Sequence, residues 1–279
     1  MNDLDASRIS AEILHLSPGF VPRVVVSDQT ASTNDDARQS ASRGAPSGTV
    51  FFAEQQTAGR GRSGNVWFSP PGENLYFSVV LRPRVEPAAL PPLALLLGLV
   101  VASVVDEALG SSSTFAGIKW PNDVLVEGKK ISGLLLETSF RGGKMDAVVA
   151  GIGLNVHTVS FPETLGATAT SLRILGARSL DRSLLAARLL VGIHSVMGAF
   201  EAEGLGPFHA ELSRRDALLG VPLEANGARG FGAGIERDGS LCVRNEAGVL
   251  VHVGSGGVTP LGPFVSPRIV GAGVSGTHG

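Results

Sequence analysis

The feature that most constrains the fold is a series of short strand-forming segments joined by very tight turns between positions 115 and 156. Apolar runs at 124–126 and 131–138 flank the turn Glu127-Gly128-Lys129-Lys130, and a further run at 147–156 follows the turn at 141–144. Turns this short join antiparallel neighbours, because parallel strands need a long crossover. We therefore predict an α+β fold with a mixed, largely antiparallel sheet and helices packed on one side of it.

A polar helix from the cap at 32–35 to about Arg43, two further helices and three further strands complete the expected main domain. The most apolar stretch, 90–105, contains Pro91 and Pro92 and is shorter than the roughly 20 residues that a membrane crossing needs. It is better explained as a buried helix opened by prolines, so no membrane partner is expected. A second helix is predicted over 181–203 behind an Asp181 cap, and strands are predicted at 24–26, 49–54 and 75–81.

The texture of the chain changes near Leu218, where short β segments alternate with turn residues such as Asp238-Gly239 and Ala247-Gly248. This pattern is typical of a small barrel-like β domain. We therefore divide the chain into a short leader, a main domain, a small β domain and a Gly/Ser-rich tail predicted to be disordered, at 1–24, 25–216, 217–263 and 264–279.

Composition excludes several classes of function. The net charge of −2 provides no electrostatic footprint for nucleic acid. Residues 1–10 carry no secretory signal, and Cys242 is the only cysteine, which rules out an internal disulfide, a CxxC pair or a zinc site built from cysteines. These features favour a reducing cytoplasm. The six histidines show no metal-binding spacing along the sequence, and Cys242 is expected to be a small buried hydrophobe.

The segment Gly59-Arg60-Gly61-Arg62-Ser63-Gly64 is the strongest local indication of chemistry. Glycines allow a backbone to approach an anion closely, and the interleaved guanidinium groups supply forked positive donors. The segment is neither a Walker loop, which needs Gly-Lys-Ser/Thr, nor a nucleophile elbow, which needs a final glycine. It suits a carboxylate or a phosphate, although a mobile basic loop is an equal alternative.

Three more segments combine small, polar or cationic residues in ways that suit a ligand. Lys119-Trp120-Pro121-Asn122-Asp123 places a lysine before a proline turn, where its ammonium could face an anion. Ser32-Thr33-Asn34 predicts a helix N-terminus, which can also bind an acceptor oxygen. Gly151-Ile152-Gly153-Leu154-Asn155 lacks the third glycine of a dinucleotide-binding loop.

Taken together and in this order, with Ala53 to Arg62, Trp67 and Lys130-Ile131-Ser132-Gly133 between them, these segments resemble the biotin–protein ligase family from about residue 25 to 262. The resemblance implies a class II synthetase-like catalytic domain followed by a small SH3-like β-barrel. It also implies an enzyme that joins biotin and ATP, with Mg²⁺, into biotinyl-5′-AMP and pyrophosphate. The biotinyl group would then pass to one lysine of a biotin carboxyl carrier protein.

The resemblance also implies residue roles. Ser32, Thr33, Asn34 and Gln56 would hold the biotin head group, and Gly59, Arg60, Gly61 and Arg62 would fold over biotin and the adenylate. Lys119 would sit beside the biotin carboxylate and the α-phosphate, with Arg60 and Arg62 as the other catalytic cations. Trp67, Gly133 and Asn155 would line the adenylate side. The metal ligands stay unknown, with Asp123 and Glu137 as candidates by position only.

One departure from the family concerns DNA. Some members carry a winged helix-turn-helix of about 60 residues before the catalytic domain, whereas the Ser-Thr-Asn motif here begins at residue 32. We therefore expect no nucleic-acid partner. A homodimer is left open.

Three alternatives remain at this point. A lipoate–protein ligase would share the fold and the adenylation chemistry, but its relatives lack the Gly-Arg-Gly-Arg and Trp-Pro combination. A biotin-responsive regulator without enzymatic activity, or a generic anion-binding scaffold, would account for single motifs. Biotin-dependent exchange between ATP and pyrophosphate would separate these alternatives.

Overall fold

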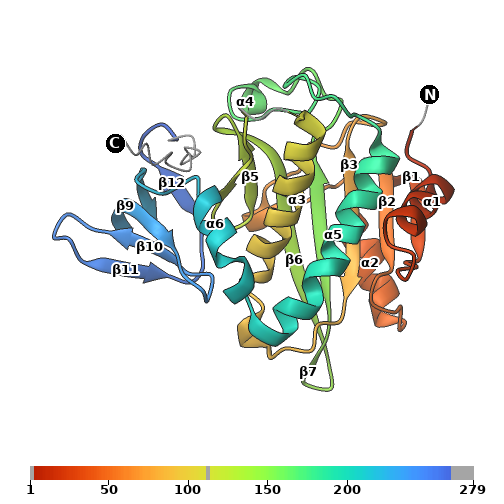
Figure 1. Ribbon diagram of the computed structural model, residues 1–279, viewed down its shortest axis with the longest axis horizontal. Helices are drawn as coiled ribbons and strands as arrows, with labels where there is room; N and C mark the ends of the chain where they lie inside the picture. Colours follow the sequence, from red (N-terminus) through yellow and green to blue (C-terminus); the bar gives the residue numbers. More distant parts are fainter. Residues whose placement is uncertain (1–2, 111–113, 265–279) are drawn as a thin grey trace, which may run out of the picture.

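The computed structural model describes residues 3–110 and 114–264. Its body is one seven-stranded sheet, with strands in the order β1-β2-β3-β7-β6-β5-β4 (Figure 1). β1 and β2 pair in parallel and every other neighbouring pair is antiparallel, which confirms the mixed, largely antiparallel prediction. The strands are β1 Val24–Thr30, β2 Val50–Gln56, β3 Leu75–Leu81, β4 Gly117–Lys119, β5 Asp123–Val126, β6 Lys129–Arg141 and β7 Lys144–Leu154.

Helices cover both faces of this sheet, so the expectation of helices on one side is wrong. The long helices α3 (Leu93–Leu109) and α5 (Arg182–Glu203) pack on one face together with alternate sheet residues such as Val79 and Val148. The intervening residues of the same strands, Val80 and Val149, pack with Ala37 and Ala41 of α2 (Thr33–Ser42) on the other face. The sequence does not reveal this arrangement, because a strand buried on both faces shows no alternation of apolar and polar residues.

The apolar segment predicted to be a buried helix is the centre of the core. α3 begins after Pro92 and ends at Gly110, whose left-handed conformation (φ 58°) terminates it. Two helical stretches, Pro87–Leu109 and Arg182–Glu203, are long and apolar enough to cross a membrane by length and composition alone. In the first, 72% of the most apolar window is buried within the fold, as expected of a core helix.

The N-terminal segment contributes to the same core. α1 (Ala6–Leu16) is capped by Asp5, whose side chain accepts a hydrogen bond from the Arg8 amide at 2.8 Å. It packs against α5, and its residues Ile9 and Ile13 are fully buried. The segment predicted as a leader therefore stabilises the main body. The remaining short helices are α4 Glu163–Gly166, α6 His209–Arg215, η1 Arg62–Gly64, η2 Pro87–Ala89 and η3 Gly206–Phe208.

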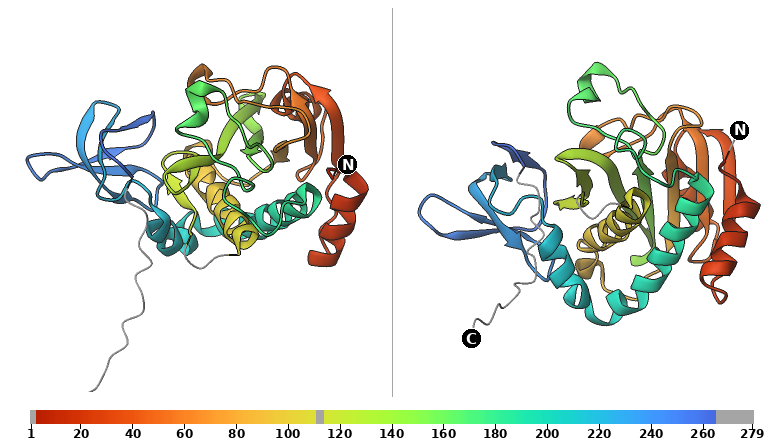
Figure 2. Two further views of the ribbon diagram at one scale, coloured as in Figure 1. Left: turned by 90° about the horizontal axis from the view of Figure 1, so that it is seen from above. Right: turned by 45° about the horizontal axis from the view of Figure 1, so that its top comes forward.

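The C-terminal strands form a second, five-stranded antiparallel sheet that projects from the side of the body (Figures 1 and 2). Its order is β11-β10-β9-β8-β12, which fits the predicted small β domain, while SH3-like closure stays a prediction. The Trp120 indole joins it to the body by donating to the Gly239 carbonyl at 2.9 Å. The strands are β8 Pro222–Ala225, β9 Ala228–Ile235, β10 Leu241–Arg244, β11 Leu250–Val253 and β12 Val258–Pro260. Apart from Phe264, the tail predicted to be disordered lies outside the described residues.

Candidate active site

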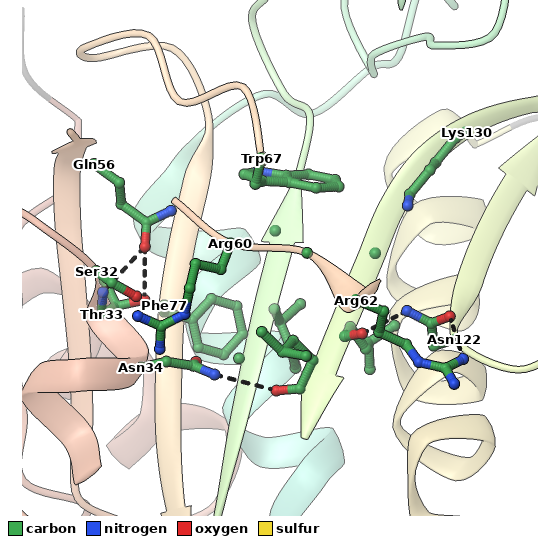
Figure 3. Close-up of a pocket in the computed structure, with 17 residues that line it drawn as sticks. Ser32, Thr33, Asn34, Gln56, Arg60, Arg62, Trp67, Phe77, Asn122 and Lys130 are labelled. Carbon is green, nitrogen blue, oxygen red and sulfur yellow. Dashed lines mark hydrogen bonds between the residues drawn. The ribbon is translucent and has the colours of Figure 1, made fainter. Parts of the chain in front are cut away.

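A cavity opens over the middle of the seven-stranded sheet, between the start of α2 and the loop at 59–67 (Figure 3). The lining residues come from the start of α2, β2, the loop, β3, the turn before β5, β6 and β7: Ser32, Thr33, Asn34, Gln56, Arg60, Gly61, Arg62, Trp67, Phe77, Asn122, Lys130, Gly133, Leu134, Leu135, Gly151, Ile152 and Gly153.

At one end of the cavity, the start of α2 is held by the side chain of Gln56 at the end of β2. Ser32 occupies the N-cap position, but its hydroxyl makes no capping hydrogen bond. Instead, the Gln56 side-chain oxygen accepts from the Thr33 backbone amide at 3.0 Å and from the Thr33 hydroxyl at 3.2 Å. The Gln56 amide nitrogen donates to Ser69 at 3.1 Å. Gln56 is thereby fixed in one orientation beside the helix N-terminus, where backbone N–H groups favour an acceptor oxygen.

Asn34 extends this hydrogen-bond network to β3 and β6. Its side-chain oxygen lies 2.5 Å from the Ser78 hydroxyl, and its amide nitrogen donates to Glu137 at 2.6 Å. Asn34 approaches β7 so closely that a Cβ on Gly151 would lie 2.1 Å from the Asn34 side-chain oxygen, so any side chain at position 151 would displace Asn34. Ser32, Thr33 and Asn34 are 2–4% exposed, so these polar groups are pre-oriented rather than solvated.

Trp67 lies across two neighbouring strands, over a pair of glycines. Gly133 of β6 and Gly153 of β7 are partners in the sheet register, and a Cβ on Gly153 would lie 2.3 Å from the indole ring. The paired glycines therefore make a flat surface for the ring. The Trp67 indole N–H is buried and has no hydrogen-bond partner among the residues that the structure describes. A buried donor of this kind costs stability unless a ligand or water satisfies it.

The loop between Gly59 and Trp67 closes on itself. Arg60 and Val66 form an antiparallel bridge, the Gly61 amide donates to the Asn65 carbonyl at 2.7 Å, and the Trp67 amide donates to the Gly59 carbonyl at 2.9 Å. The central part of the loop therefore has the hydrogen bonds of a hairpin. These bonds hold Arg60 and Arg62 above the cavity (Figure 3).

Arg60 is held by two carboxylates. Its guanidinium donates to both oxygens of Asp35, at 2.6 and 2.9 Å, and lies 3.3 Å from Glu137. The hydrogen bond with Asp35 raises the pKa of Arg60, and the same contact holds the pKa of Asp35 below its ordinary value. Arg60 is thus a positive charge whose position is fixed by Asp35 and Glu137.

Arg62 is held by neutral oxygens and connects the two sheets. It donates to the Asn122 side chain and to the Gly256 carbonyl of the C-terminal domain, each at 3.2 Å. Asn122 is fixed in turn, because its amide nitrogen donates to the Leu134 carbonyl at 2.6 Å. Because both of these hydrogen bonds go to uncharged carbonyl oxygens, the positive charge of Arg62 is not neutralised by them and can attract an anionic ligand.

Two lysines share one carboxylate beside Arg62. Asp123 lies 2.6 Å from the Lys130 ammonium and 3.9 Å from the Lys119 ammonium. Lys130 also faces the Trp67 ring, with its nitrogen 5.2 Å from the ring centroid. Lysine ammonium groups are mobile point charges, so an incoming phosphate can compete for both.

The structure brings most of the predicted site residues to one cavity and leaves three outside its lining. Gly59 packs behind the loop, where a Cβ would meet Ser69, Gln56 and the Trp67 carbonyl within 2.9 Å. Asn155 is buried past the end of β7 and donates to the Thr170 carbonyl at 2.9 Å. Lys119 lies behind Asp123 with 23% of its side chain exposed. The lining contains Ser32, Thr33, Asn34, Gln56, Arg60, Gly61, Arg62, Trp67 and Gly133 from that prediction.

Several lining residues were not predicted as site residues. Lys130, Asn122 and the two glycines at 151 and 153 belong to motifs quoted above, and their spacing could have indicated them. Phe77, Leu134, Leu135 and Ile152 carry no such indication, because apolar strand residues are usually core residues. Their part in the cavity depends on the small residues beside them.

The cavity can therefore bind a ligand with one uncharged polar end and one anionic end. It offers neutral donors and acceptors beside α2, an indole over the centre, and the side chains of Arg62 and Lys130 at the far end (Figure 3). This arrangement suits the positioning of two anions against each other and requires no nucleophilic side chain.

Comparison with known proteins gives a consistent result. Residues 26–155 match the model of the biotin/lipoate A/B protein ligase family. A biotin–[acetyl-CoA-carboxylase] ligase of Mycobacterium tuberculosis is 34% identical over 92% of this chain and 96% of its own. The bifunctional ligase/repressor BirA of Bacillus spizizenii is 32% identical over 81% of this chain and 70% of its own. The solved biotin protein ligase of Aquifex aeolicus in complex with biotin and ATP has a TM-score of 0.73, at 28% identity, and covers 85% of this chain and 99% of that one.

Proposed function

This chain belongs to the biotin/lipoate A/B protein ligase family, and from that premise we propose that it is a biotin–protein ligase. The observation that carries the proposal is the two-ended cavity in a chain that aligns over 96% of a biotin–[acetyl-CoA-carboxylase] ligase. Relatives in solved structures bind biotin with ATP, or biotinyl-5-AMP. Biotin and ATP are accordingly the substrates that we assign to this enzyme.

The reaction has two steps. A carboxylate oxygen of biotin attacks the α-phosphorus of ATP, and the bond to the β-phosphate breaks, which gives biotinyl-5′-AMP and pyrophosphate. The amine of an acceptor lysine then attacks the acyl carbon and expels AMP, with one proton passing to solvent or base. Both steps depend on charge neutralisation and alignment, so no covalent enzyme intermediate is expected.

The neutral end of the cavity would bind the ureido ring of biotin. An uncharged urea needs both donors and acceptors, which Ser32, Thr33, Asn34 and Gln56 can supply. The apolar side chains of Phe77 and Ile152 would accommodate the tetrahydrothiophene ring and the valeryl chain.

The cationic end would hold the reacting groups. We assign Lys119 to the biotin carboxylate and α-phosphate, with Arg60 and Arg62 as the other catalytic cations. Lys130 supports this assignment, because its ammonium group and that of Lys119 both contact the carboxylate of Asp123. Binding of a triphosphate would shift both lysines from Asp123 to phosphate oxygens.

Trp67 and the loop at 59–67 would cover the adenylate. The unsatisfied Trp67 indole N–H supports a ligand oxygen in this region. A lid over the mixed anhydride would exclude water and limit its hydrolysis. Gly133 would line the adenylate side of the cavity. Asn155 would fix the chain next to that side by donating to the Thr170 carbonyl.

Mg²⁺ fits the site as part of the ATP complex rather than in a cage made by the protein alone. Asp123 and Glu137 are the candidate ligands by position, but Asp123 pairs with Gly133, four residues before Glu137 on β6, so only one of the two would ligate a given ion. Mg²⁺ usually takes one or two carboxylates together with phosphate oxygens and water. Bound there, it would neutralise triphosphate charge.

The remaining assignments concern partners and location. We propose a biotin carboxyl carrier protein as acceptor, since related enzymes are named for acetyl-CoA carboxylase. A single cysteine supports a reducing cytoplasm. A net charge of −2 argues against DNA binding, which an electrophoretic shift assay tests directly.

The decisive experiment is exchange of labelled pyrophosphate into ATP by the purified protein. Exchange that requires biotin, and that lipoate does not support, is the expected result. Exchange that lipoate supports instead would replace the assignment by a lipoate–protein ligase. Absence of exchange with either acid would leave only an anion-binding scaffold and would overturn the proposal.

A further inference from the structure

Three potential metal ligands lie together in the C-terminal sheet, and the proposed reaction does not use them. Glu236, Cys242 and His252 each present one ligand atom, and these three atoms lie within 4.8 Å of one another. The Cys242 sulfur is 3.2 Å from a Glu236 oxygen and 3.5 Å from the His252 Nδ1 nitrogen. They provide sulfur, nitrogen and oxygen donors.

Sheet geometry brings the three side chains together. Cys242 of β10 and His252 of β11 are direct partners in the antiparallel register, so their side chains stand side by side on one face. On the other side, the partner of Cys242 in β9 is Gly234, which carries no side chain. Glu236 follows Gly234 by two residues, a spacing that returns to the same face of a strand and reaches the thiol diagonally.

The spacing of the donors matches a tetrahedral zinc site. With Zn–S near 2.3 Å and Zn–N near 2.0–2.1 Å, two ligand atoms of a tetrahedron are separated by about 3.5 Å. The measured sulfur–nitrogen distance is 3.5 Å, and the sulfur–oxygen distance of 3.2 Å needs only a small movement of a glutamate side chain. Cys242 is 2% exposed, whereas Glu236 and His252 are exposed, so a metal would sit on the thiol and face solvent.

We propose that Glu236, Cys242 and His252 form a binding site for a borderline divalent cation, with Zn²⁺ as the expected occupant. A thiolate and an imidazole select Zn²⁺ over Mg²⁺ and Ca²⁺, which prefer oxygen ligands. Three protein ligands leave the fourth position to water. The metal charge is balanced by one thiolate and one carboxylate, and Asp238, fixed by Ser240 at 2.7 and 2.9 Å, adds negative charge near His252.

Metal binding would replace a hydrogen bond by coordinate bonds. Without metal, the Cys242 thiol donates a hydrogen bond to Glu236. Binding of the dication would release the thiol proton to solvent as the sulfur becomes a thiolate ligand. The bound ion would tie β11, β10 and the end of β9 together in a domain too small for a large core.

Cobalt(II) tests this proposal with the full-length protein, because a thiolate–cobalt charge-transfer band can arise only from Cys242 in a chain with one cysteine. Reduced, chelator-treated protein is titrated with Co²⁺ in excess Mg²⁺ and without biotin or ATP, so the result is independent of the proposed function. Zn²⁺ is then added to displace Co²⁺. The expected result is a charge-transfer band with tetrahedral d–d bands, both removed by Zn²⁺.

Variants identify the ligands. Cys242→Ser should abolish the charge-transfer band, and His252→Gln and Glu236→Gln should each weaken Co²⁺ binding by at least about tenfold, because each removes one of three coordinate bonds or its charge. His15→Gln changes an exposed histidine on α1 and should bind like the wild type. His252 and Glu236 are exposed, so their variants test the site even if Cys242→Ser fails to fold.

A wild-type protein that binds no Co²⁺ or Zn²⁺ would overturn the proposal. It would also be overturned if Cys242→Ser, folded by circular dichroism, kept the wild-type affinity, or if His15→Gln alone weakened binding.

Discussion

The two ends of the cavity hold their polar side chains in different ways. At the end beside α2, Thr33, Asn34 and Gln56 are joined by neutral hydrogen bonds and two of the three are almost fully buried. At the end beside β5, Lys119, Lys130 and Arg62 contact Asp123, Asn122 and a backbone carbonyl, and the ammonium groups are partly exposed. One end is built before a ligand arrives, whereas the other has cations that can change partners.

This difference follows from what each end would bind. An uncharged urea provides little electrostatic attraction, so its recognition needs fixed donors and acceptors whose ordering is already complete. A triphosphate attracts cations strongly, and movable lysines can follow its charge during the reaction. The following predictions test whether the two ends are separable in this way.

The largest effect is expected from Lys119→Ala. Removal of a cation beside the α-phosphate should lower biotin-dependent pyrophosphate exchange by about 10³-fold, while the thermal midpoint stays close to wild type. Lys144→Ala, an exposed lysine in the β6–β7 turn, is the matched control. Wild-type exchange by Lys119→Ala, or a larger loss in Lys130→Ala, would transfer the role to Lys130.

Arg62→Gly should loosen the lid. Arg62 links the loop to Asn122 and Gly256, and a charged hydrogen-bond donor lost from a closed site costs about ten- to a hundredfold in retention. The dissociation rate of preformed biotinyl-AMP measures this directly. A rate equal to that of the wild type would contradict the lid role.

Thr33→Val should affect the neutral end alone. It keeps the shape of the side chain but removes the hydroxyl that contacts Gln56 and Ser78, so biotin should bind about five- to tenfold more weakly. The KM for ATP should not change. Thr49→Val, which also removes a buried hydroxyl but lies away from the cavity, controls for stability. An equal change in both substrates would show that the two ends are coupled.

The smallest effect is expected from Asp35→Asn. Asp35 and Arg60 are both about one-third exposed, and ion pairs of this kind are weak, so biotin affinity should change by no more than about threefold. Because Arg60 holds the pKa of Asp35 below its ordinary value, the pair stabilises the fold at neutral pH and loses that contribution as the pH falls through the lowered pKa. The difference in unfolding midpoint between wild type and variant should therefore vanish in acid.

The antiparallel order of β5, β6 and β7 was predictable because their turns are so short that no other pairing is possible. The buried helix α3 was predictable from its length and its prolines. The use of both faces of the sheet was not, because strands such as β3 are buried at every position and show no alternation. The unpredicted Lys130 lines the cavity and lies 2.6 Å from Asp123, whereas the predicted Lys119 lies 3.9 Å from Asp123 and outside the lining. Local sequence does not encode this difference.

What the sequence alone determined is the fold class, and it also supplied the candidate site segments: the arginine–glycine loop, the polar start of α2 and a lysine before a proline turn. These features are local, because turns, caps and loop glycines act over a few residues. Only the tertiary structure decided that Trp67 rests on two paired glycines and that Cys242 meets His252 and Glu236. Contacts between neighbouring strands depend on register, and register is fixed by packing of the whole sheet rather than by spacing along the chain.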